Sequence, residues 1–290
     1  MRTTLCLLIA ITIFFSACNS GQQKAAEQES ATQDSTTFQP AWKLGIQLWT
    51  FNISTFYDAI DRVDSTGLKY IEVFPGQKLS KSDTTGFGPA LSQAQRDSVK
   101  ALLNRRGLTI TSFGVTGADD VDGWKKLFDF AKDMNIPVIV SEPPNSQWDF
   151  VDKMAGEYNI KIAIHDHPKP AHFWHYDSVL AAINGHPNIG SCADVGHWAR
   201  NGLNPVDCMK ALKGHIWDVH FKDITTFNKV NANDTVPGKG VIDFKAVFQE
   251  LKDQGYTGAI SIEHESNWEH AVDDIKEIIA FYKEQMKLLK

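Results

Sequence analysis

The stretch "HIWDVHFK", residues 215–222, alternates hydrophobic and polar side chains along its length. Successive side chains of a β-strand point to opposite faces of the sheet, so one face of this strand carries Asp218, His220 and Lys222. An antiparallel sandwich would turn such a polar face to water, whereas a parallel barrel covered by helices turns it inward. The stretch therefore favours a parallel barrel with polar side chains inside.

Two further strands alternate in the same way. In "IKIAIHDHP" (160–168) the polar face ends in His165 and His167, and in "GAISIEHES" (258–266) it reaches Glu263. The polar residues gather toward the C-terminal end of each strand. That end is where (β/α)8 barrel enzymes carry their catalytic groups.

Short hydrophobic strands alternate with amphipathic helices after Trp42. The predicted strands span residues 43–49, 68–74, 108–115, 136–142, 160–167, 188–194, 215–222 and 258–265. The predicted helices span residues 55–66, 91–106, 121–134, 147–158, 175–184, 205–213, 243–254 and 268–288. This strict alternation predicts a single-domain (β/α)8 TIM barrel. The alternative, an open doubly wound sheet, needs a glycine-rich phosphate loop after the first strand, and "LWTFN" is not one.

The N-terminal segment "MRTTLCLLIAITIFFSAC" combines an early arginine, a hydrophobic run and small residues before Cys18. It is typical of a secretory signal, and its end, "FFSAC", resembles a bacterial lipoprotein signal in which the cysteine is lipidated. Residues 19–41 contain almost no large hydrophobic side chains and are predicted to be a disordered linker. We therefore expect a signal peptide over 1–18, a catalytic barrel over 42–290, and an exported, membrane-anchored lipoprotein facing the periplasm. A plain signal peptide is the alternative.

The formal net charge of −6 and the absence of a basic cluster argue against nucleic acid as a partner. Contact with a membrane is expected only through the N-terminal anchor. Of the four cysteines, only Cys192 and Cys208 lie in the mature fold, which indicates packing residues and no disulfide framework. The net charge and the cysteine count fit a small neutral or metal-chelating substrate. They leave the oligomeric state open.

Ionisable residues from most of the strands converge on the predicted mouth of the barrel. They are Glu72, Glu142, His165, His167, Asp194, His197, His220, Lys222 and Glu263. Several converging carboxylates would repel one another and shift each other's pKa unless a cation compensated them. One divalent metal ion does this most simply, and Mn²⁺, Co²⁺, Zn²⁺ and Mg²⁺ all suit imidazole and carboxylate ligands. For Glu72, a buried hydrogen-bonding role is an equal alternative.

The stretch "CADVGHWARNG", residues 192–202, places Asp194 and His197 three positions apart. On a helix this spacing would put both side chains on one face. The preceding "HPNIGSCAD" predicts a strand, however, which argues against a helix at this point. Asp194 is then the last residue of the sixth strand and points into the mouth.

The segments "ADVGHWARNGLNP", "VHFKDI", "VPGKGVIDF" and "ISIEHES" together resemble the xylose-isomerase-like sugar phosphate isomerase/epimerase family, over about residues 43–288. The resemblance implies a (β/α)8 barrel with one divalent metal held by two glutamates, an aspartate and a histidine. Matched motif by motif, it implies Asp194, His220 and Glu263 as metal ligands.

The chain departs from the family pattern at strand five, where the epimerases carry a glutamate that is both ligand and base. The matching position here is His165. Glu142, on the adjacent strand, is therefore our candidate for the missing carboxylate, as a metal ligand and a catalytic residue.

The implied chemistry is removal of a proton from the carbon beside a sugar carbonyl, through a metal-stabilised enediolate. His165 or His167 is the predicted base, and Glu263 is a second possible proton carrier. Lys222 is predicted to position or protonate a substrate oxygen. Its alternative is a salt bridge with Asp194 or Glu263.

The resemblance favours a sugar isomerase or epimerase acting on a small carbohydrate. A β-eliminating lyase or dehydratase that acts on a 3-keto-glycoside at the same site is a close alternative. The alternative that is not an enzyme is a non-catalytic sugar-binding lipoprotein. A phosphodiesterase resembling endonuclease IV would need three metals and more histidine ligands, and an acidic exported chain is a poor partner for DNA.

The long polar loop at 223–244 is predicted to be a lid over the substrate, with Gly238 and Gly240 as flexible points. Aromatic and polar side chains near the strand ends are candidates for contact with the sugar. The predicted substrate-binding residues are Trp49, Glu72, His197 and Lys239.

Overall fold

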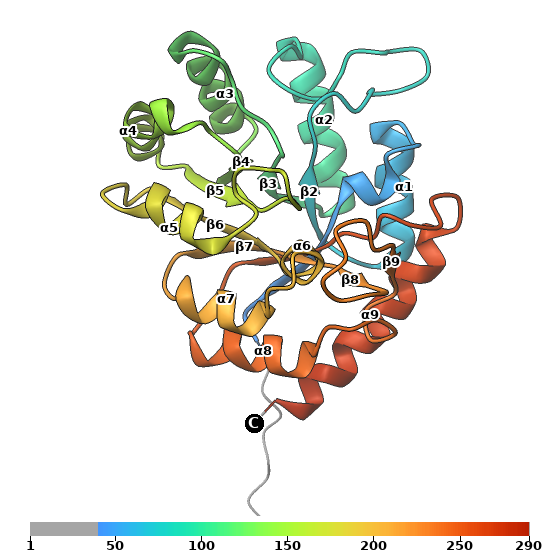
Figure 1. Cartoon of the computed structure of the whole chain (residues 1–290). Coiled ribbons are helices and arrows are strands. Elements are labelled where there is room, and N and C mark those ends of the chain that lie inside the picture. The colour runs from blue at the N-terminus through green and yellow to red at the C-terminus, as the bar shows by residue number, and fades with distance from the viewer. Residues whose placement is uncertain (1–39, 290) are drawn as a thin grey trace, which may run out of the picture. The chain divides into compact units, whose positions relative to one another are not determined.

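The computed structural model describes residues 40–289, in which eight parallel strands close into a barrel surrounded by helices (Figure 1). The strands follow the order β1-β10-β7-β6-β5-β4-β3-β2 around the barrel. They are β1 (Lys43–Gln47), β2 (Tyr70–Val73), β3 (Thr109–Phe113), β4 (Val138–Ser141), β5 (Lys161–His165), β6 (Ile189–Asp194), β7 (Ile216–Phe221) and β10 (Ala259–Ile262). The alternating helices are α1 (Phe56–Thr66), α2 (Gln93–Arg106), α3 (Val121–Asp133), α4 (Trp148–Tyr158), α5 (Tyr176–Ile183), α7 (Pro205–Ala211), α8 (Phe244–Asp253) and α9 (Ala271–Leu288). The predicted TIM barrel is confirmed.

The predicted signal peptide, with Cys18, and nearly all of the predicted linker lie outside the described residues. What the sequence predicts for them stays a prediction. Within residues 40–289, no helix is both long and hydrophobic enough to cross a membrane.

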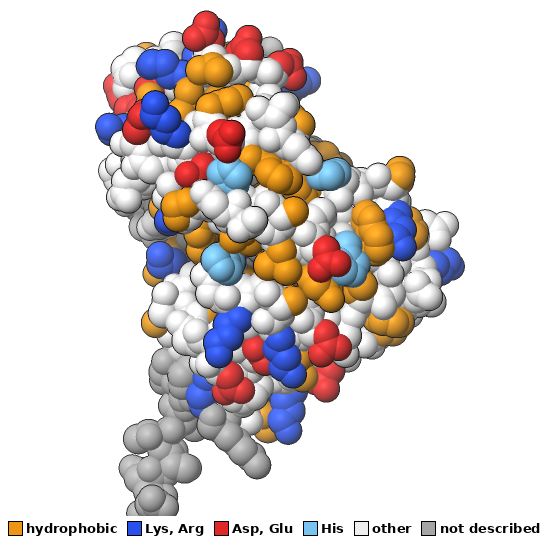
Figure 2. Space-filling view, turned by 60° about the vertical axis from the view of Figure 1, so that its left-hand side comes forward, with side chains coloured by type: hydrophobic (Ala, Val, Ile, Leu, Met, Phe, Trp, Pro, Cys, Tyr) orange, Lys and Arg blue, Asp and Glu red, His pale blue; other side chains and the backbone are white. Residues whose placement is uncertain are grey.

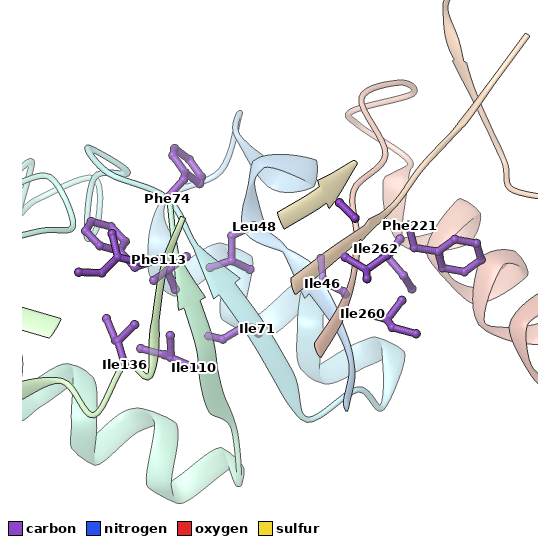
Figure 3. Packing of buried hydrophobic residues seen from close by; sticks show 14 of the residues in the cluster. Ile46, Leu48, Ile71, Phe74, Ile110, Phe113, Ile136, Phe221, Ile260 and Ile262 are labelled. Carbon is purple, nitrogen blue, oxygen red and sulfur yellow. The ribbon is translucent and has the colours of Figure 1, made fainter. Parts of the chain in front are cut away.

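The alternation along β7 separates polar from hydrophobic side chains as predicted. His220 and Lys222 are fully buried, and the strand register places His220 beside Asp194 of β6. On the outer face, Phe221 reaches the surrounding helices and packs on Phe244 of α8, with 4.7 Å between ring centroids (Figure 3). The outer faces of the strands thus form the hydrophobic core with the helices, and polar groups concentrate inside.

Local sequence signals set the helix ends. Helix α2 begins with a capping box, in which Ser92 Oγ accepts the Gln95 N–H and the Gln95 side chain accepts the Ser92 N–H at 2.8 Å. It ends at Gly107, whose φ of +63° lies in the left-handed region that favours glycine. Such caps explain why the predicted helix boundaries fall close to the observed ones.

The residues after β6 form a helix, contrary to the prediction. Helix α6 spans Val195–Arg200, and Asp194 is both the last residue of β6 and the N-cap of α6. Its Oδ1 accepts the His197 N–H at 2.8 Å. The prediction failed because an N-cap residue has extended backbone angles and can end a strand and start a helix at once. The cap uses Oδ1 only, so Oδ2 can have other partners.

The glycines in the loop after β7 are anchored by hydrogen bonds. The Asp223 carboxylate accepts the N–H groups of Gly238, Gly240, Val241 and Ile242 at 3.0 to 3.2 Å. A Cβ at Gly240 would come within 2.3 Å of Asp223 Oδ1. Position 240 therefore requires glycine for the close approach of a carboxylate, and flexibility at Gly238 and Gly240 stays a prediction.

Asp223→Ala is expected to lower the free energy of unfolding by about 3 kcal/mol, because several part-buried N–H groups lose their acceptor at about 1–3 kcal/mol for each one left buried. Urea unfolding followed by circular dichroism measures the change. Asp243→Ala is the matched control, because it removes a single cap bond to the Ala246 N–H and should cost about 1 kcal/mol. Equal losses in the two variants would contradict the anchoring role of Asp223.

Candidate metal centre

Four buried side chains bring their donor atoms together at the C-terminal ends of the strands. They are His165 at the end of β5, Asp194 at the end of β6, His220 in β7 and Glu263 directly after β10. One donor atom of each lies within 4.8 Å of the others. His220 Nδ1 is 3.1 Å from His165 Nε2 and 3.0 Å from Glu263 Oε2. Two imidazole nitrogens and two carboxylate oxygens so placed form a donor set that divalent transition metals accept.

The fourth donor in this cluster is His165, not Glu142. Glu142 belongs to a neighbouring group, in which its Oε1 lies 3.7 Å from His165 Nδ1 and contacts His167 Nδ1. Glu142, His165 and His167 form a second group whose donor atoms could hold a metal ion, so the role of Glu142 as a ligand stays a prediction. The His165 ring turns Nε2 toward the other three donors and Nδ1 toward Glu142, so it separates Glu142 from the cluster.

Two buried carboxylates orient the donors. His220 Nε2 lies 2.9 Å from Glu72 Oε2, so this nitrogen donates to Glu72 while Nδ1 faces the other donors. The Asp194 N–H donates to Asp166 Oδ1 at 2.9 Å. Glu72 is fully buried and does not line the cavity. The structure therefore favours a buried hydrogen-bonding role for Glu72 over the predicted contact with substrate.

Glu72→Gln is expected to weaken Mn²⁺ binding by 10- to 100-fold, on the order found when the partner of a metal-bound histidine is removed. The amide keeps the shape of the side chain but removes the charge that holds the His220 proton on Nε2. Calorimetric titration with Mn²⁺ measures the affinity, and Glu157→Gln, at an exposed position of α4, is the control. Unchanged affinity in Glu72→Gln would show that His220 needs no such partner.

Lys222 is fully buried, and carboxylates surround its ammonium group. Its Nζ is 3.3 Å from Asp194 Oδ2 and 2.9 Å from Glu263 Oε2, and it also pairs with Glu265. Burial lowers the pKa of Lys222, but these three carboxylates and Asp234 outweigh burial and hold this pKa well above its usual value. Lys222 does not line the cavity, so the structure favours the salt bridge over the predicted contact with substrate. The ammonium group fixes both cluster carboxylates and offsets part of their repulsion.

Both cluster carboxylates turn a buried oxygen toward the other donors. Among residues 40–289, neither Asp194 Oδ2 nor Glu263 Oε2 accepts a hydrogen bond of good geometry, although Lys222 is close to both. Burial raises the pKa of each, but neighbouring charges, including Lys222, hold both pKa values well below the ordinary range. Ionised oxygens without hydrogen bonds are costly to bury unless they bind a cation. The donor set therefore fits one divalent metal ion.

A cavity of about 500 Å³ opens beside the cluster, within the range of small-molecule sites, about 300–1,000 Å³. Its wall includes residues 230–232 from the loop between the short strands β8 (Asp223–Ile224) and β9 (Asp234–Thr235), so this loop does cover part of the cavity. On the face shown in Figure 2, histidines lie among hydrophobic side chains, and acidic and basic side chains are interspersed. The cavity wall also contains Trp49, Phe74, His165, His167, His197, Arg200, Glu263 and Glu265.

His167 forms part of this wall, with a carboxylate bonded to its ring. Its Nδ1 is hydrogen-bonded to Glu142 Oε1, and 43% of its side chain is exposed. Burial raises the pKa of Glu142, but the hydrogen bonds with His165 and His167 outweigh it and lower this pKa to about 2. An ionised carboxylate that holds one ring nitrogen leaves the other available for proton transfer, as in a general base.

Arg200 and Asp234 belong to the site although neither was predicted. Arg200 Nη1 donates to His197 Nδ1 at 2.8 Å, and its other terminal nitrogen pairs with Asp234. Burial lowers the pKa of His197 well below its usual value, more than Asp194 raises it, so His197 is neutral with its proton on Nε2. Arg200 follows His197 by three positions, so the two side chains share one face of helix α6. Had a helix been predicted there, this spacing would have indicated Arg200 as a partner of His197.

Two predicted substrate contacts have different positions in the structure. Trp49 lines the cavity, is 40% exposed, and rests edge-on against Phe74 with 5.0 Å between ring centroids. Lys239 lies outside the cavity, where its Nζ is 2.6 Å from Glu277 Oε1 of α9. In this structure the Lys239 side chain thus points away from the cavity, and its contact with substrate stays a prediction.

Comparisons with known proteins identify chains of similar sequence and fold. Inosose isomerase from Halalkalibacterium halodurans is 28% identical over 242 residues, which cover 75% of this chain and 85% of that protein. Inosose dehydratase from Lactiplantibacillus plantarum is 30% identical over 148 residues, which cover 42% of this chain and 48% of that protein. A crystal structure of a Parabacteroides distasonis protein is 32% identical, covers 84% of this chain and 99% of that one, and superposes with a TM-score of 0.69.

The family itself follows from the extent of the match. The model of the family described as xylose isomerase-like TIM barrel matches residues 60–285, which include all four clustered donors. The relatives include an isomerase and a dehydratase, which supports an enzyme of this kind. With its closed barrel and a match over most of its length, the chain belongs to the xylose isomerase-like TIM barrel family.

Proposed function

We propose that the protein is a metal-dependent sugar isomerase that moves a proton from the carbon beside a carbonyl group to the carbonyl carbon. The observation that carries the proposal is His167 in the cavity wall, next to the four clustered donors, with the Glu142 carboxylate bonded to its ring. The similarity to inosose isomerase, which extends over most of both chains, supports it.

Different residues of the site have different roles in the proposed reaction. A divalent cation held by the cluster would polarise the carbonyl of a bound sugar and make the neighbouring C–H more acidic. His167 takes that proton on Nε2, and Glu142 stabilises the imidazolium that forms. His197 donates its Nε2–H toward a substrate oxygen, and Trp49 covers one face of the sugar.

The exposed proton carrier is His167, and the second predicted carrier is engaged elsewhere. Glu263 Oε2 lies 2.9 Å from Lys222 Nζ and 3.0 Å from His220 Nδ1, so this oxygen belongs to the donor cluster. Epimerisation by two bases needs a carrier on each face of the sugar. A single proton carrier returns the proton to the same face of the sugar from which it took it. One carrier therefore favours isomerisation over epimerisation.

β-Elimination is the second candidate, because it uses the same single base. His167 takes the same proton, but a substituent on the next carbon leaves with its bonding electrons. The similarity to inosose dehydratase supports this reaction, over 42% of the chain.

The test is incubation of the Mn²⁺-loaded protein in heavy water with ketoses, inososes and 3-keto-glycosides, followed by metal removal and proton NMR. Deuterium beside the carbonyl, together with a product in which the carbonyl has moved to the neighbouring carbon, would support the isomerase. An unsaturated product would replace it with the lyase or dehydratase. No exchange in any compound would contradict both and leave the sugar-binding alternative.

We also propose that the chain is exported and lipidated at Cys18, which rests on its N-terminal sequence alone. Expression of the full chain in a bacterial host with radiolabelled palmitate should label the membrane fraction, and Cys18→Ala should abolish the label. A labelled Cys18→Ala variant, or an unlabelled native chain, would contradict lipidation at this residue.

A further inference from the structure

A second cavity, also about 500 Å³, adjoins the one at the metal cluster. The two cavities share Val115 and His167 in their walls. The second is bounded by residues 115–119 after β3 and by residues 141–144 at the end of β4, and Glu142 lines it. The Glu142–His167 pair therefore stands at the junction of two cavities.

The wall of the second cavity is built by a specific network. The Gln147 side chain is buried, and its Nε2 donates to the carbonyl oxygens of Ala118 and Asp119 at 3.1 and 3.0 Å. Its Oε1 accepts the indole N–H of Trp124 at 2.8 Å. Both the oxygen and the nitrogen of the Gln147 amide are therefore engaged, and they hold residues 118–119 against α3. Because this network needs no ligand, the cavity is pre-formed.

The lining also offers polar groups for a ligand. Ser141, fully buried at the end of β4, has a hydroxyl oxygen without a hydrogen-bond partner among the described residues. Thr116 and the carboxylates of Asp119 and Glu142 line the same cavity beside an apolar surface that includes Pro143. Hydroxyls and carboxylates next to an apolar surface suit the mixed OH and CH faces of a sugar ring.

The charges exclude an anionic ligand. Among the described residues, the lining of the second cavity contains Asp119 and Glu142 but no Lys or Arg. In the first cavity the guanidinium of Arg200 is already paired with Asp234. A phosphate or carboxylate group in the second cavity would therefore meet two carboxylates and, apart from His167, no side chain there that can carry a positive charge.

We propose that the second cavity binds a second, neutral sugar unit, so that the substrate is a two-unit carbohydrate lying across both cavities with its linkage beside His167. The inference rests on the proposed function for the reacting unit. It adds that the unit in the first cavity carries a neutral glycosyl substituent.

The test compares one and two sugar units on the same protein. Calorimetric titration of the full, Mn²⁺-loaded chain with glucose, maltose and cellobiose measures binding without turnover. At least tenfold tighter binding of one disaccharide than of glucose is expected. Equal dissociation constants for all three sugars would overturn the inference.

Variants that fill the second cavity test whether the tighter binding of the disaccharide depends on this cavity. Thr116→Trp, in the loop after β3, and Pro144→Trp, at an exposed position across the cavity, should each remove most of the preference for the disaccharide. Thr257→Trp adds the same bulk at an exposed position just before β10 and should keep the preference. A preference retained in both cavity variants, shown to be folded by circular dichroism, would overturn the inference.

Deuterium exchange into 3-ketoglucose and 3-ketocellobiose separates this inference from the proposed function. No exchange in either compound, with disaccharide binding still tighter, would remove the isomerase and lyase proposals and keep the second sugar site. Exchange in both compounds at equal efficiency, with equal binding of the sugars, would keep the enzyme and remove the second site.

Discussion

Asp194→Asn is expected to lower Mn²⁺ affinity by more than 100-fold and to stop deuterium exchange in any substrate of the enzyme. The Asp194 Oδ2 atom is buried and lies 3.7 Å from both cluster histidines, His165 and His220. Loss of a contact that only orients a ligand weakens metal binding about 10- to 100-fold, so loss of the charged ligand itself should weaken binding more.

Asparagine is the informative replacement, because it can still cap α6 through its side-chain oxygen and so preserves the helix that carries His197. Calorimetric titration gives the affinity, and plasma mass spectrometry gives the metal content of the purified protein. Asp207→Asn, at an exposed position of α7, is the matched control. A variant that binds Mn²⁺ as tightly as the native chain would show that the cluster is not the metal site.

The barrel could be predicted because its signals are local and repeated. Alternating polar and hydrophobic residues in β5, β7 and β10 reveal which side chains point inward, and a parallel barrel then brings the strand ends together. Strand-end position placed all four clustered donors at the mouth, and the family resemblance implied Asp194, His220 and Glu263 among them as ligands.

The fourth donor depends on side-chain directions that strand assignments do not contain. Glu142 and His165 end adjacent strands, and either could have reached the other donors; the orientation of the His165 ring decides between them. The pairing of Lys239 with Glu277 of α9 is likewise a contact between residues far apart in the sequence, which no local pattern shows.

His167→Gln is expected to reduce kcat by about 10²- to 10⁴-fold, the usual contribution of a general base. His167 lies outside the four-donor cluster, so Mn²⁺ affinity should change by less than about threefold, far below the effect of removing a ligand partner. Glutamine can still bond Glu142 and fill the wall, but it cannot carry the proton. Steady-state kinetics and Mn²⁺ titration on the same preparations measure the two effects.

The matched control is His172→Gln, at an exposed position after β5, which should leave both quantities unchanged. Glu142→Gln should give a smaller loss of kcat than His167→Gln, because the base remains and only the charge that stabilises its imidazolium is removed. If His167→Gln instead lost Mn²⁺ in parallel with activity, His167 would be a metal ligand. The base would then have to be sought among the other cavity residues, with Glu263 the first to test.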